Sequence, residues 1–234
     1  MIPEIVLIHG SWMGGWCWRA VAEILRARGV RCHAPTLTGL GEREHLSRAD
    51  INLDQHILDV LNACRFADVA RPLLVGHSYG ALVAAGVADQ LQGEVSGLVV
   101  IDGFIVDSGQ SAFDAYPQVR DLLGACITPA YPNFIQPLPI AAFDVHDGVL
   151  TDELARKLRP MPLTTHTTPL NFSPPLLRRL PRTYIRCTDF PIFAATAARA
   201  VADGWTLAEI GAGHMAVVTH PALIADAIVA AAQG

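Results

Sequence analysis

The sequence predicts an α/β fold built on a mostly parallel sheet. Short apolar runs of strand length alternate with longer segments of helical pattern along most of the chain, as is typical of such sheets. The 234 residues suffice for one sizeable domain with a substantial core. Apolar residues make up 51% of the chain and charged residues only 17%, which favours a well-buried sheet and argues against disorder.

Each element is expected from its local pattern. The expected strands are Glu4–Ile8, Val30–Ala34, Leu73–Val75, Val95–Asp102, Thr183–Cys187 and Thr206–Ile210. The expected helices are Trp16–Arg28, Leu53–Phe66, Tyr79–Leu91, Ile192–Ala202 and Pro221–Ala232. Pro221 suits the first turn of the closing helix, because its missing N–H needs no partner there.

The alternation lapses between residues 103 and 181, where prolines are frequent but apolar side chains persist. A structureless loop of that length is improbable in a compact domain. We therefore expect residues 1–102 and 182–234 to form the core and residues 103–181 an inserted cap over the active site. The alternative is a small packing subdomain that does not touch the substrate.

The most informative motif is Gly76-His77-Ser78-Tyr79-Gly80, which follows an apolar strand and precedes a helical pattern. Strand, tight turn and helix in this order are typical of a nucleophile elbow, in which a strained serine is lifted above the sheet edge. The alternative is a Gly-Ser turn without chemistry. We interpret Ser78 as a candidate nucleophile.

A serine hydroxyl needs a base, and His214 is the candidate because it lies on a glycine-rich loop between the last strand and the last helix. His77 is locked in the elbow, and His220 is placed to start the final helix. Five others are expected to be surface or satisfied groups; they are His33, His45, His56, His146 and His166.

The first loop, His9-Gly10-Ser11-Trp12, follows the first strand. Gly10 frees the backbone there, so that the amide of Ser11 can point at a developing oxyanion. The amide of Tyr79, the residue after the nucleophile, is the expected second donor. The alternative for this loop is a plain strand-exit turn.

These motifs together resemble the α/β-hydrolase superfamily, in particular the branch of methylesterases, hydroxynitrile lyases and related bacterial esterases. The matching segments are His9 to Trp18, Leu37 to Arg43, Gly76 to Gly80 and Gly213 to Met215. The resemblance implies the α/β-hydrolase fold, with a sheet that starts at the oxyanion strand. It covers the core on both sides of the expected cap.

The lyases of this branch carry a hydroxylated residue after the first motif histidine and a lysine after the catalytic histidine. Gly10 and Met215 stand at those positions here. Both departures favour an esterase over a cyanohydrin lyase.

Two residues compete for the acid of a triad. Most of the superfamily carries it just after the penultimate strand, where Asp189 lies near, but one residue short of, the expected position. Asp102 ends the strand that follows the nucleophile helix, and a carboxylate that ends an apolar run needs a partner. We favour Asp102 and keep Asp189 as the alternative; a strand-capping role for Asp102 stays open.

The sequence thus favours a cofactor-independent serine carboxylesterase that acts on a small, largely apolar ester. Trp12, Phe104 and Phe113 are expected to line the substrate pocket. The alternatives are a lyase or a carbon–carbon or carbon–nitrogen bond hydrolase on the same scaffold, or a small-molecule receptor with vestigial activity.

Other partners are not indicated. The net charge of −5 comes without a basic patch, which argues against nucleic acid, and no apolar run reaches membrane-spanning length. No histidine–carboxylate spacing indicates a metal site. The N-terminus lacks the pattern of a signal peptide, and five scattered cysteines without a C-x-x-C pair are expected to be reduced thiols, so we expect a cytoplasmic protein. The oligomeric state is not predicted.

Overall fold

The computed structural model describes residues 2–143, 145 and 147–233. Their strands form a six-stranded sheet in the order β2-β1-β3-β4-β7-β8, and every neighbouring pair is parallel. The strands are β1 (Ile5–Ile8), β2 (Cys32–His33), β3 (Leu73–His77), β4 (Gly97–Ile101), β7 (Arg182–Cys187) and β8 (Thr206–Ile210). The predicted parallel sheet is confirmed. Its first strand along the chain is β1, which lies where the first strand was predicted.

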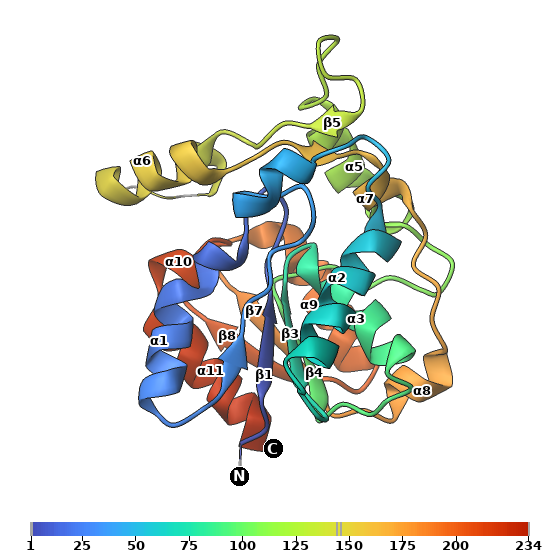
Figure 1. Cartoon of the computed structure of the whole chain (residues 1–234), viewed down its shortest axis with the longest axis vertical. Helices are drawn as coiled ribbons and strands as arrows, with labels where there is room; N and C mark the ends of the chain where they lie inside the picture. The colour runs from blue at the N-terminus through green and yellow to red at the C-terminus, as the bar shows by residue number, and fades with distance from the viewer. Residues whose placement is uncertain (1, 144, 146, 234) are drawn as a thin grey trace.

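Helices cover both faces of this sheet (Figure 1). Helices α1 (Arg19–Ala27) and α11 (Pro221–Gln233) pack together on one face. Helices α2 (Leu53–Phe66), α3 (Gly80–Gln90) and α9 (Ala194–Ala202) lie on the other. Apolar side chains in the middle of the sheet are almost completely excluded from solvent, and Ile5–Ile8 of β1 are at most 1% exposed. Buried parallel strands of this kind read as continuous apolar runs, which is why the sequence pattern located them.

The predicted boundaries differ from the observed ones mainly at the first helix and at β2. The predicted helix Trp16–Arg28 begins as a 3-10 turn, η1 (Gly15–Trp18), before α1. The predicted strand Val30–Ala34 shrinks to two residues because it pairs only with Ile5 and Val6 at the sheet edge. Two short elements were not predicted, η2 (Gly41–Leu46) and α10 (Ala216–Thr219).

The segment between β4 and β7 has its own short elements. These are α4 (Ala112–Ala115), α5 (Pro117–Gly124), β5 (Phe134–Ile135), η3 (Ile140–Phe143), α6 (Gly148–Lys157), β6 (Met161–Pro162), α7 (Thr164–Thr167) and α8 (Pro174–Arg178). Strands β5 and β6 form an antiparallel ribbon, and most of the segment lies beyond the carboxyl ends of the sheet strands, whereas α8 lies beside α3 (Figure 1). The remaining 3-10 turn, η4 (Pro191–Phe193), precedes α9.

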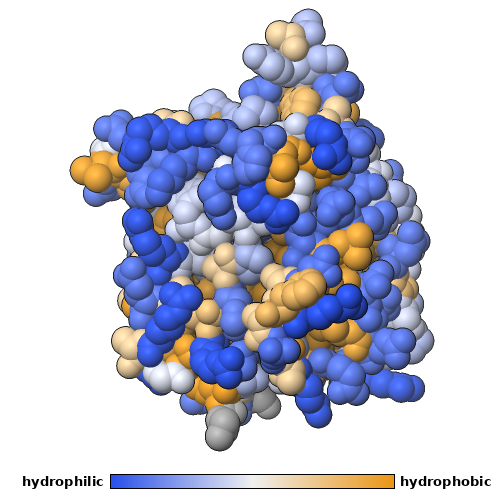
Figure 2. Space-filling model, in the orientation of Figure 1, coloured by the Kyte–Doolittle hydropathy of each residue, from blue (hydrophilic) through white to orange (hydrophobic). Residues whose placement is uncertain are grey.

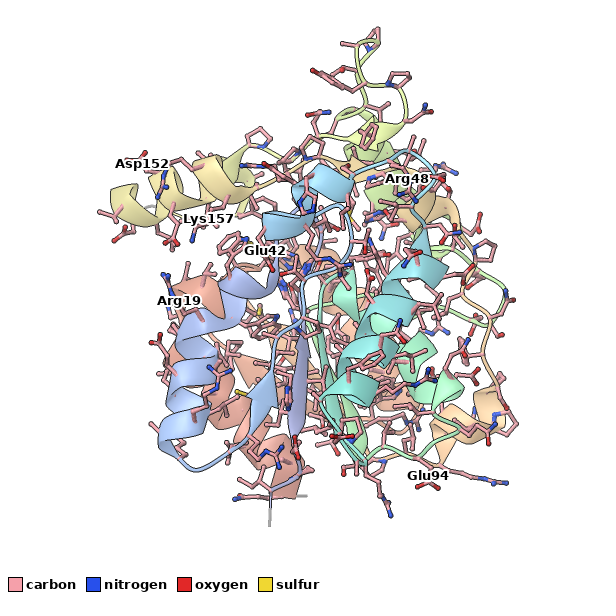
Figure 3. The ribbon with its side chains drawn as sticks, viewed as in Figure 1. Arg19, Glu42, Arg48, Glu94, Asp152 and Lys157 are labelled. Atoms are coloured by element: carbon pink, nitrogen blue, oxygen red, sulfur yellow. The ribbon has the colours of Figure 1, made fainter. Side chains whose placement is uncertain are left out.

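Helix α6 is tied to the core by charged side chains. The Nζ atom of Lys157 lies 4.8 Å from the centroid of the Trp16 ring. Glu153 contacts Lys157 at 2.5 Å and Arg19 of α1 at 3.6 Å. Figure 3 shows Lys157 on the side of α6 that faces the core and Asp152 on its outer side. These contacts hold helix α6 of the inserted segment beside η1 and α1.

The face of the molecule in Figure 2 is largely polar, with scattered apolar side chains. Leu58 and Phe66 of α2 are exposed apolar side chains. Within the described ranges, no helix combines the length and the apolar character that crossing a bilayer requires.

Candidate active site

The register of the sheet brings two predicted site residues together. In the pairing of β3 with β4, His77 lies opposite Ile101. Ser78 and Asp102, the next residue on each strand, therefore leave the same sheet edge side by side. The amide of Ser78 donates to the Ile101 carbonyl at 3.1 Å, and the amide of Asp102 donates to the Ile185 carbonyl at 2.8 Å.

Both residues have a left-handed backbone. The φ angle is +53° at Ser78 and +42° at Asp102, and Trp12 in the first loop has +64°. Non-glycine residues adopt this region rarely, at a cost of roughly 1–3 kcal/mol each. Gly80 is required for a different reason, since a Cβ there would lie 2.4 Å from the Ile8 carbonyl oxygen. The close packing of the elbow against β1 thus holds Ser78 in its strained turn.

His214 joins Ser78 to Asp102. Its Nε2 atom lies 3.1 Å from Ser78 Oγ, and its Nδ1 atom lies 2.6 Å from Asp102 Oδ2. Asp102 is fully buried and Ser78 and His214 nearly so. Because the ionised carboxylate only accepts, Nδ1 carries the proton, and Nε2 is left to accept the Ser78 hydroxyl proton.

Asp189 lies apart from this chain of hydrogen bonds. It is exposed, and its carboxylate accepts from the hydroxyl of its neighbour Thr188 at 3.1 Å. The second oxygen of Asp102 instead faces the amide of Cys187 at 3.4 Å. The structure thus brings Asp102, and not Asp189, to the imidazole.

The first loop runs directly beside the elbow. A Cβ on Gly10 would lie 2.9 Å from the Ser78 Cβ, so this position needs glycine for space and not for a positive φ. Within the described ranges, the amides of Ser11 and Tyr79 donate no hydrogen bond. His9 anchors the loop by accepting from the Leu37 amide at 3.1 Å, and burial lowers its pKa to about 4. The two predicted oxyanion donors are thus free to serve a ligand.

Aromatic rings surround the imidazole of His214. The ring centroid of Phe190 lies 4.6 Å away, that of Phe193 5.6 Å and that of Phe143 6.1 Å, and all three rings are stacked on it. Apolar rings thus enclose the imidazole.

His77 stays neutral beside the base. Its Nε2 donates to the His214 carbonyl oxygen at 2.9 Å, and its ring centroid lies 4.7 Å from that of His214. Burial, and then the nearby His214, lower its pKa well below the ordinary value. The Nδ1 atom of His77 is buried and has no hydrogen-bond partner, as expected of an unprotonated ring nitrogen.

His166 was expected to be a surface or satisfied histidine, but it lies at the site and is fully buried. The Thr165 hydroxyl donates to the Pro162 carbonyl at 2.6 Å, so it must accept from His166 Nδ1 at 2.9 Å. The bare Nε2 therefore accepts from the Ser11 hydroxyl at 3.2 Å. Burial lowers the pKa of His166 to about 3, so the ring stays neutral.

His56 was likewise expected to be a surface or satisfied histidine; it is fully buried and both of its ring nitrogens are hydrogen-bonded. Its Nε2 donates to the Thr38 carbonyl at 3.0 Å, and its Nδ1 accepts from the Tyr79 hydroxyl at 3.0 Å. The Tyr79 ring in turn stacks on His166 at 5.1 Å. No local sequence signal distinguishes these two histidines, because the partners of each lie on distant segments. His146 lies outside the described residues.

Two small adjoining cavities of about 10 and 40 Å³ open on Ser78 and His214. Trp12 lines both, and Phe104 and His166 line the larger one. Phe113, which was also expected in the pocket, lies behind His166 with the ring centroids 5.5 Å apart. The other walls of the larger cavity are mostly apolar and come largely from the inserted segment; they include Val119, Leu122, Leu123 and Leu138.

The described residues contain no group of three or more His, Cys, Asp or Glu side chains placed to hold a metal ion. The groups gathered here are instead the Ser78 hydroxyl and the His214 imidazole, with the Asp102 carboxylate behind the imidazole and two free amides nearby. This arrangement suits nucleophilic attack on a carbonyl carbon.

Comparisons with known proteins agree with this geometry. Residues 5–227 match the model of the alpha/beta hydrolase family. The chain is 32% identical to a carbendazim hydrolyzing esterase of Nocardioides sp. (strain SG-4G), over 98% of this chain and 99% of the relative. It is also 33% identical to a pyrethroid hydrolase of Sphingobium wenxiniae, over 46% of this chain and 38% of the relative.

Solved structures show the same fold. An extracellular alpha/beta-hydrolase from a Paenibacillus species superposes with a TM-score of 0.85 at 24% identity, over 98% of both chains. Tomato methylketone synthase I superposes with the same TM-score at 16% identity, over 100% of this chain and 98% of that one.

Proposed function

Since the chain belongs to the alpha/beta hydrolase family, we propose that it is a serine carboxylesterase that hydrolyses a small, largely apolar carboxylic ester. The observation that carries this proposal is the continuous chain of hydrogen bonds from Ser78 through His214 to Asp102. Ser78 is the nucleophile, His214 the general base and Asp102 the acid that orients it. The esterase and hydrolase names of the two relatives support the same reaction class.

In acylation, Ser78 Oγ adds to the ester carbonyl carbon while its proton passes to His214 Nε2 across the 3.1 Å hydrogen bond. The carbonyl π electrons move to oxygen, and the oxyanion accepts from the amides of Ser11 and Tyr79. When the tetrahedral intermediate collapses, the C–O bond to the alcohol breaks. The leaving oxygen takes the proton from Nε2, and the acyl group stays on Ser78.

In deacylation, water takes the place of the alcohol. His214 Nε2 removes a proton from the water, and the resulting hydroxide adds to the acyl carbon. Collapse of the second intermediate breaks the bond to Ser78 Oγ, which recovers its proton from Nε2. The products are one carboxylic acid and one alcohol, and the enzyme returns to its starting state without a cofactor.

Residues 103–181 act as the cap of this site. Their side chains supply most of the apolar walls of the larger cavity, whose 40 Å³ is far below the roughly 300–1,000 Å³ of typical ligand sites. An ester must therefore displace cap side chains to enter, and the apolar walls then exclude water from the reacting carbonyl. The apolar lining favours acyl and alcohol groups without charge.

The experiment that tests the proposal compares wild-type protein with Ser78→Ala on a panel of p-nitrophenyl esters of increasing acyl length, together with carbendazim, the compound in the relative's name. We expect a stoichiometric burst of nitrophenol from the wild type. Turnover by Ser78→Ala should be lower by about 10⁴-fold or more. A serine-directed organophosphate should label Ser78 once per chain, and His214→Ala should suppress the labelling.

The same panel separates the alternatives. A receptor with vestigial activity would bind esters without a burst, and a lyase would release an aldehyde from a cyanohydrin. If Ser78→Ala kept a tenth of the wild-type rate, Ser78 would not be the nucleophile.

We also place the protein in the cytoplasm, where thiols stay reduced. All five cysteines are free, and four of them are buried. Burial raises the pKa of the Cys64 thiol to about 11, so it resists oxidation. Fractionation of the source cells, with activity followed in each fraction, tests this placement.

A further inference from the structure

A second cavity of about 480 Å³ lies on the face of the sheet that carries α3, α8 and α9. Its floor is formed by Leu98 and Val100 of β4, which point to the same side of the sheet because they are two residues apart. Ala81 and Ala85 of α3 form one wall, and Leu177 of α8 closes one end. The volume falls within the range of roughly 300–1,000 Å³ that small-molecule sites occupy.

The sequence leaves this space open for two reasons. The face of α3 toward the cavity carries alanines, which fill little volume. Helix α8 begins with a pair of prolines and ends after five residues, so it is too short to fill the space beside α3. A longer helix or larger side chains at these positions would have filled the gap.

The cavity is separate from the candidate active site. Among the described residues, Phe104 alone lines both this cavity and the larger catalytic one, and it forms the wall between them. Neither Ser78 nor His214 lines the 480 Å³ cavity. A ligand held here therefore occupies a different place from the ester.

Hydrogen bonds hold the rim of the cavity in place. The Ser108 hydroxyl donates to the Phe172 carbonyl at 2.8 Å and accepts from the Phe172 amide at 3.0 Å. Arg199 donates to the Ile105 carbonyl at 3.3 Å and pairs with Asp107 at 2.5 Å. Arg199 also lies 3.6 Å from Asp203. The two aspartates of the lining are thus already paired.

Two other arginines of the lining are not paired with a described carboxylate. Within the described ranges, Arg178 and Arg182 form no ion pair, while the Arg182 guanidinium donates to the Asp203 main-chain carbonyl at 3.0 Å. Its carbon atom lies 5.2 Å from the centroid of the Trp205 ring. The Nε atom of Arg182 is buried, and no described residue accepts a hydrogen bond from it. A buried donor of this kind costs free energy until an acceptor reaches it.

Burial and a neighbouring cation both disfavour the charged form of Arg182. Burial lowers the pKa of the Arg182 guanidinium, the Asp203 carboxylate opposes this effect, and the Arg178 charge adds to it. An anion between the two arginines would relieve both the burial cost and the repulsion. Asp107, Asp203 and Arg199 of the lining are already paired with one another, and most of the remaining lining is apolar, so a ligand with several charges would leave some of them unpaired.

We propose that this cavity is a second ligand site, which binds an amphipathic monocarboxylate with its apolar chain on Leu98 and Val100 and its carboxylate on Arg182 and Arg178. The carboxylate accepts from the guanidinium groups, and the chain fills the space between α3, α8 and β4. Arginine suits this role because its planar fork matches the two carboxylate oxygens. Binding requires no esterase activity and does not depend on the catalytic roles assigned above.

The test measures binding of decanoate and of decanol to the whole chain by isothermal titration calorimetry. We expect decanoate to bind one site per chain at least tenfold more tightly than decanol. Ala85→Phe, which fills the cavity, should weaken decanoate binding at least tenfold. The double variant Arg178→Met with Arg182→Met should bind decanoate no better than decanol. Arg65→Met, which removes an exposed arginine of α2, is the matched control and should bind as the wild type does.

A variant that narrows the catalytic cavity shows whether decanoate binds there instead. Val119→Trp narrows that cavity and leaves the second one open. Decanoate binding that survives Ala85→Phe and is lost in Val119→Trp would overturn the proposal, and so would equal affinities for decanoate and decanol or no binding at all.

A fluorescence measurement decides the matter even if Ala85→Phe does not fold. 2-Bromodecanoate carries its bromine beside the carboxylate, and in the proposed pose the bromine quenches the Trp205 indole. Quenching should therefore be saturable in the wild type and fall at least threefold in Trp205→Phe. Quenching that is the same in both proteins would place the carboxylate elsewhere and overturn the proposal.

Discussion

Replacement of Asp102 by asparagine is the sharpest test of the candidate triad. The carboxylate faces two donors, with His214 Nδ1 at 2.6 Å from Oδ2 and the amide of Cys187 at 3.4 Å from Oδ1. An asparagine has only one oxygen for them. If that oxygen keeps the hydrogen bond from the Cys187 amide, the side-chain NH₂ group faces His214 Nδ1. The Nδ1 atom must then accept a hydrogen bond from this NH₂ group. The imidazole proton moves to Nε2, where it blocks proton transfer from Ser78.

The expected loss follows from this wrong tautomer and from the lost negative charge beside the imidazolium. Together they should lower turnover by up to about 10⁴-fold, which corresponds to about 5.4 kcal/mol of transition-state stabilisation. Substrate binding should change little, because Asp102 is fully buried and does not line the catalytic cavities. The loss should therefore appear in kcat and not in KM.

The assay is steady-state hydrolysis of p-nitrophenyl acetate by wild type, Asp102→Asn and Asp189→Asn. Asp189→Asn is the matched control. Because Asp189 is exposed, its replacement should lower turnover by less than about tenfold. Circular dichroism checks that both variants are folded. If Asp189→Asn lost most of its turnover while Asp102→Asn kept it, the assignment of Asp102 as the acid would be refuted. If both kept activity within tenfold, the imidazole would need no carboxylate and the triad would be a dyad.

Three further outcomes are expected. His166→Phe, which removes the acceptor of the Ser11 hydroxyl, should lower kcat about tenfold, while His166→Gln should recover part of the loss; equal kcat in all three proteins would exclude a positioning role. Phe104→Ala should change relative rates among esters by about ten- to a hundredfold while organophosphate labelling of Ser78 persists; a uniform loss with labelling gone would show a role in the chemistry. Stability should be highest above pH 6.5 and fall as the pH drops toward 4, because the buried His9 and His56, whose pKa is about 4 in the folded chain, and His166, whose pKa is about 3, take up protons more readily when unfolded, each at about 1.4 kcal/mol per pH unit. His77 adds to the slope in the same direction. Urea unfolding between pH 4 and 8 measures this slope, with exposed His45→Gln as a control that should leave it unchanged.

The sheet and the elbow could be predicted because their signals are local. Helix α2 and strand β8 have the predicted bounds, Leu53–Phe66 and Thr206–Ile210. An apolar run between polar turns determines a buried strand wherever its neighbours lie. The edge strand β2 was predicted too long because its pairing partner, and not its own sequence, limits it to two residues.

The site was only partly predictable because it depends on long-range pairing. The sequence left Asp102 and Asp189 in competition, and the register that sets His77 opposite Ile101 brings Asp102 beside Ser78. The place of His166 at the site could not be predicted, because its partner Ser11 lies 155 residues away in the sequence. The boundaries of the cap, residues 103–181, stay a prediction, and α8 within that range packs on the core helix α3.

The buried histidines suggest why so many imidazoles lie around one base. In the proposed mechanism His214 becomes an imidazolium, and a second positive charge 4.7 Å away on His77 would oppose that step. Burial prevents it, since it lowers the pKa of His77 well below the ordinary value and that of His166 to about 3. Neutral imidazoles thus provide hydrogen bonds that hold the loop and the elbow without adding charge. The positive charge then develops on the ring that faces both Asp102 and Ser78, which is where proton transfer needs it.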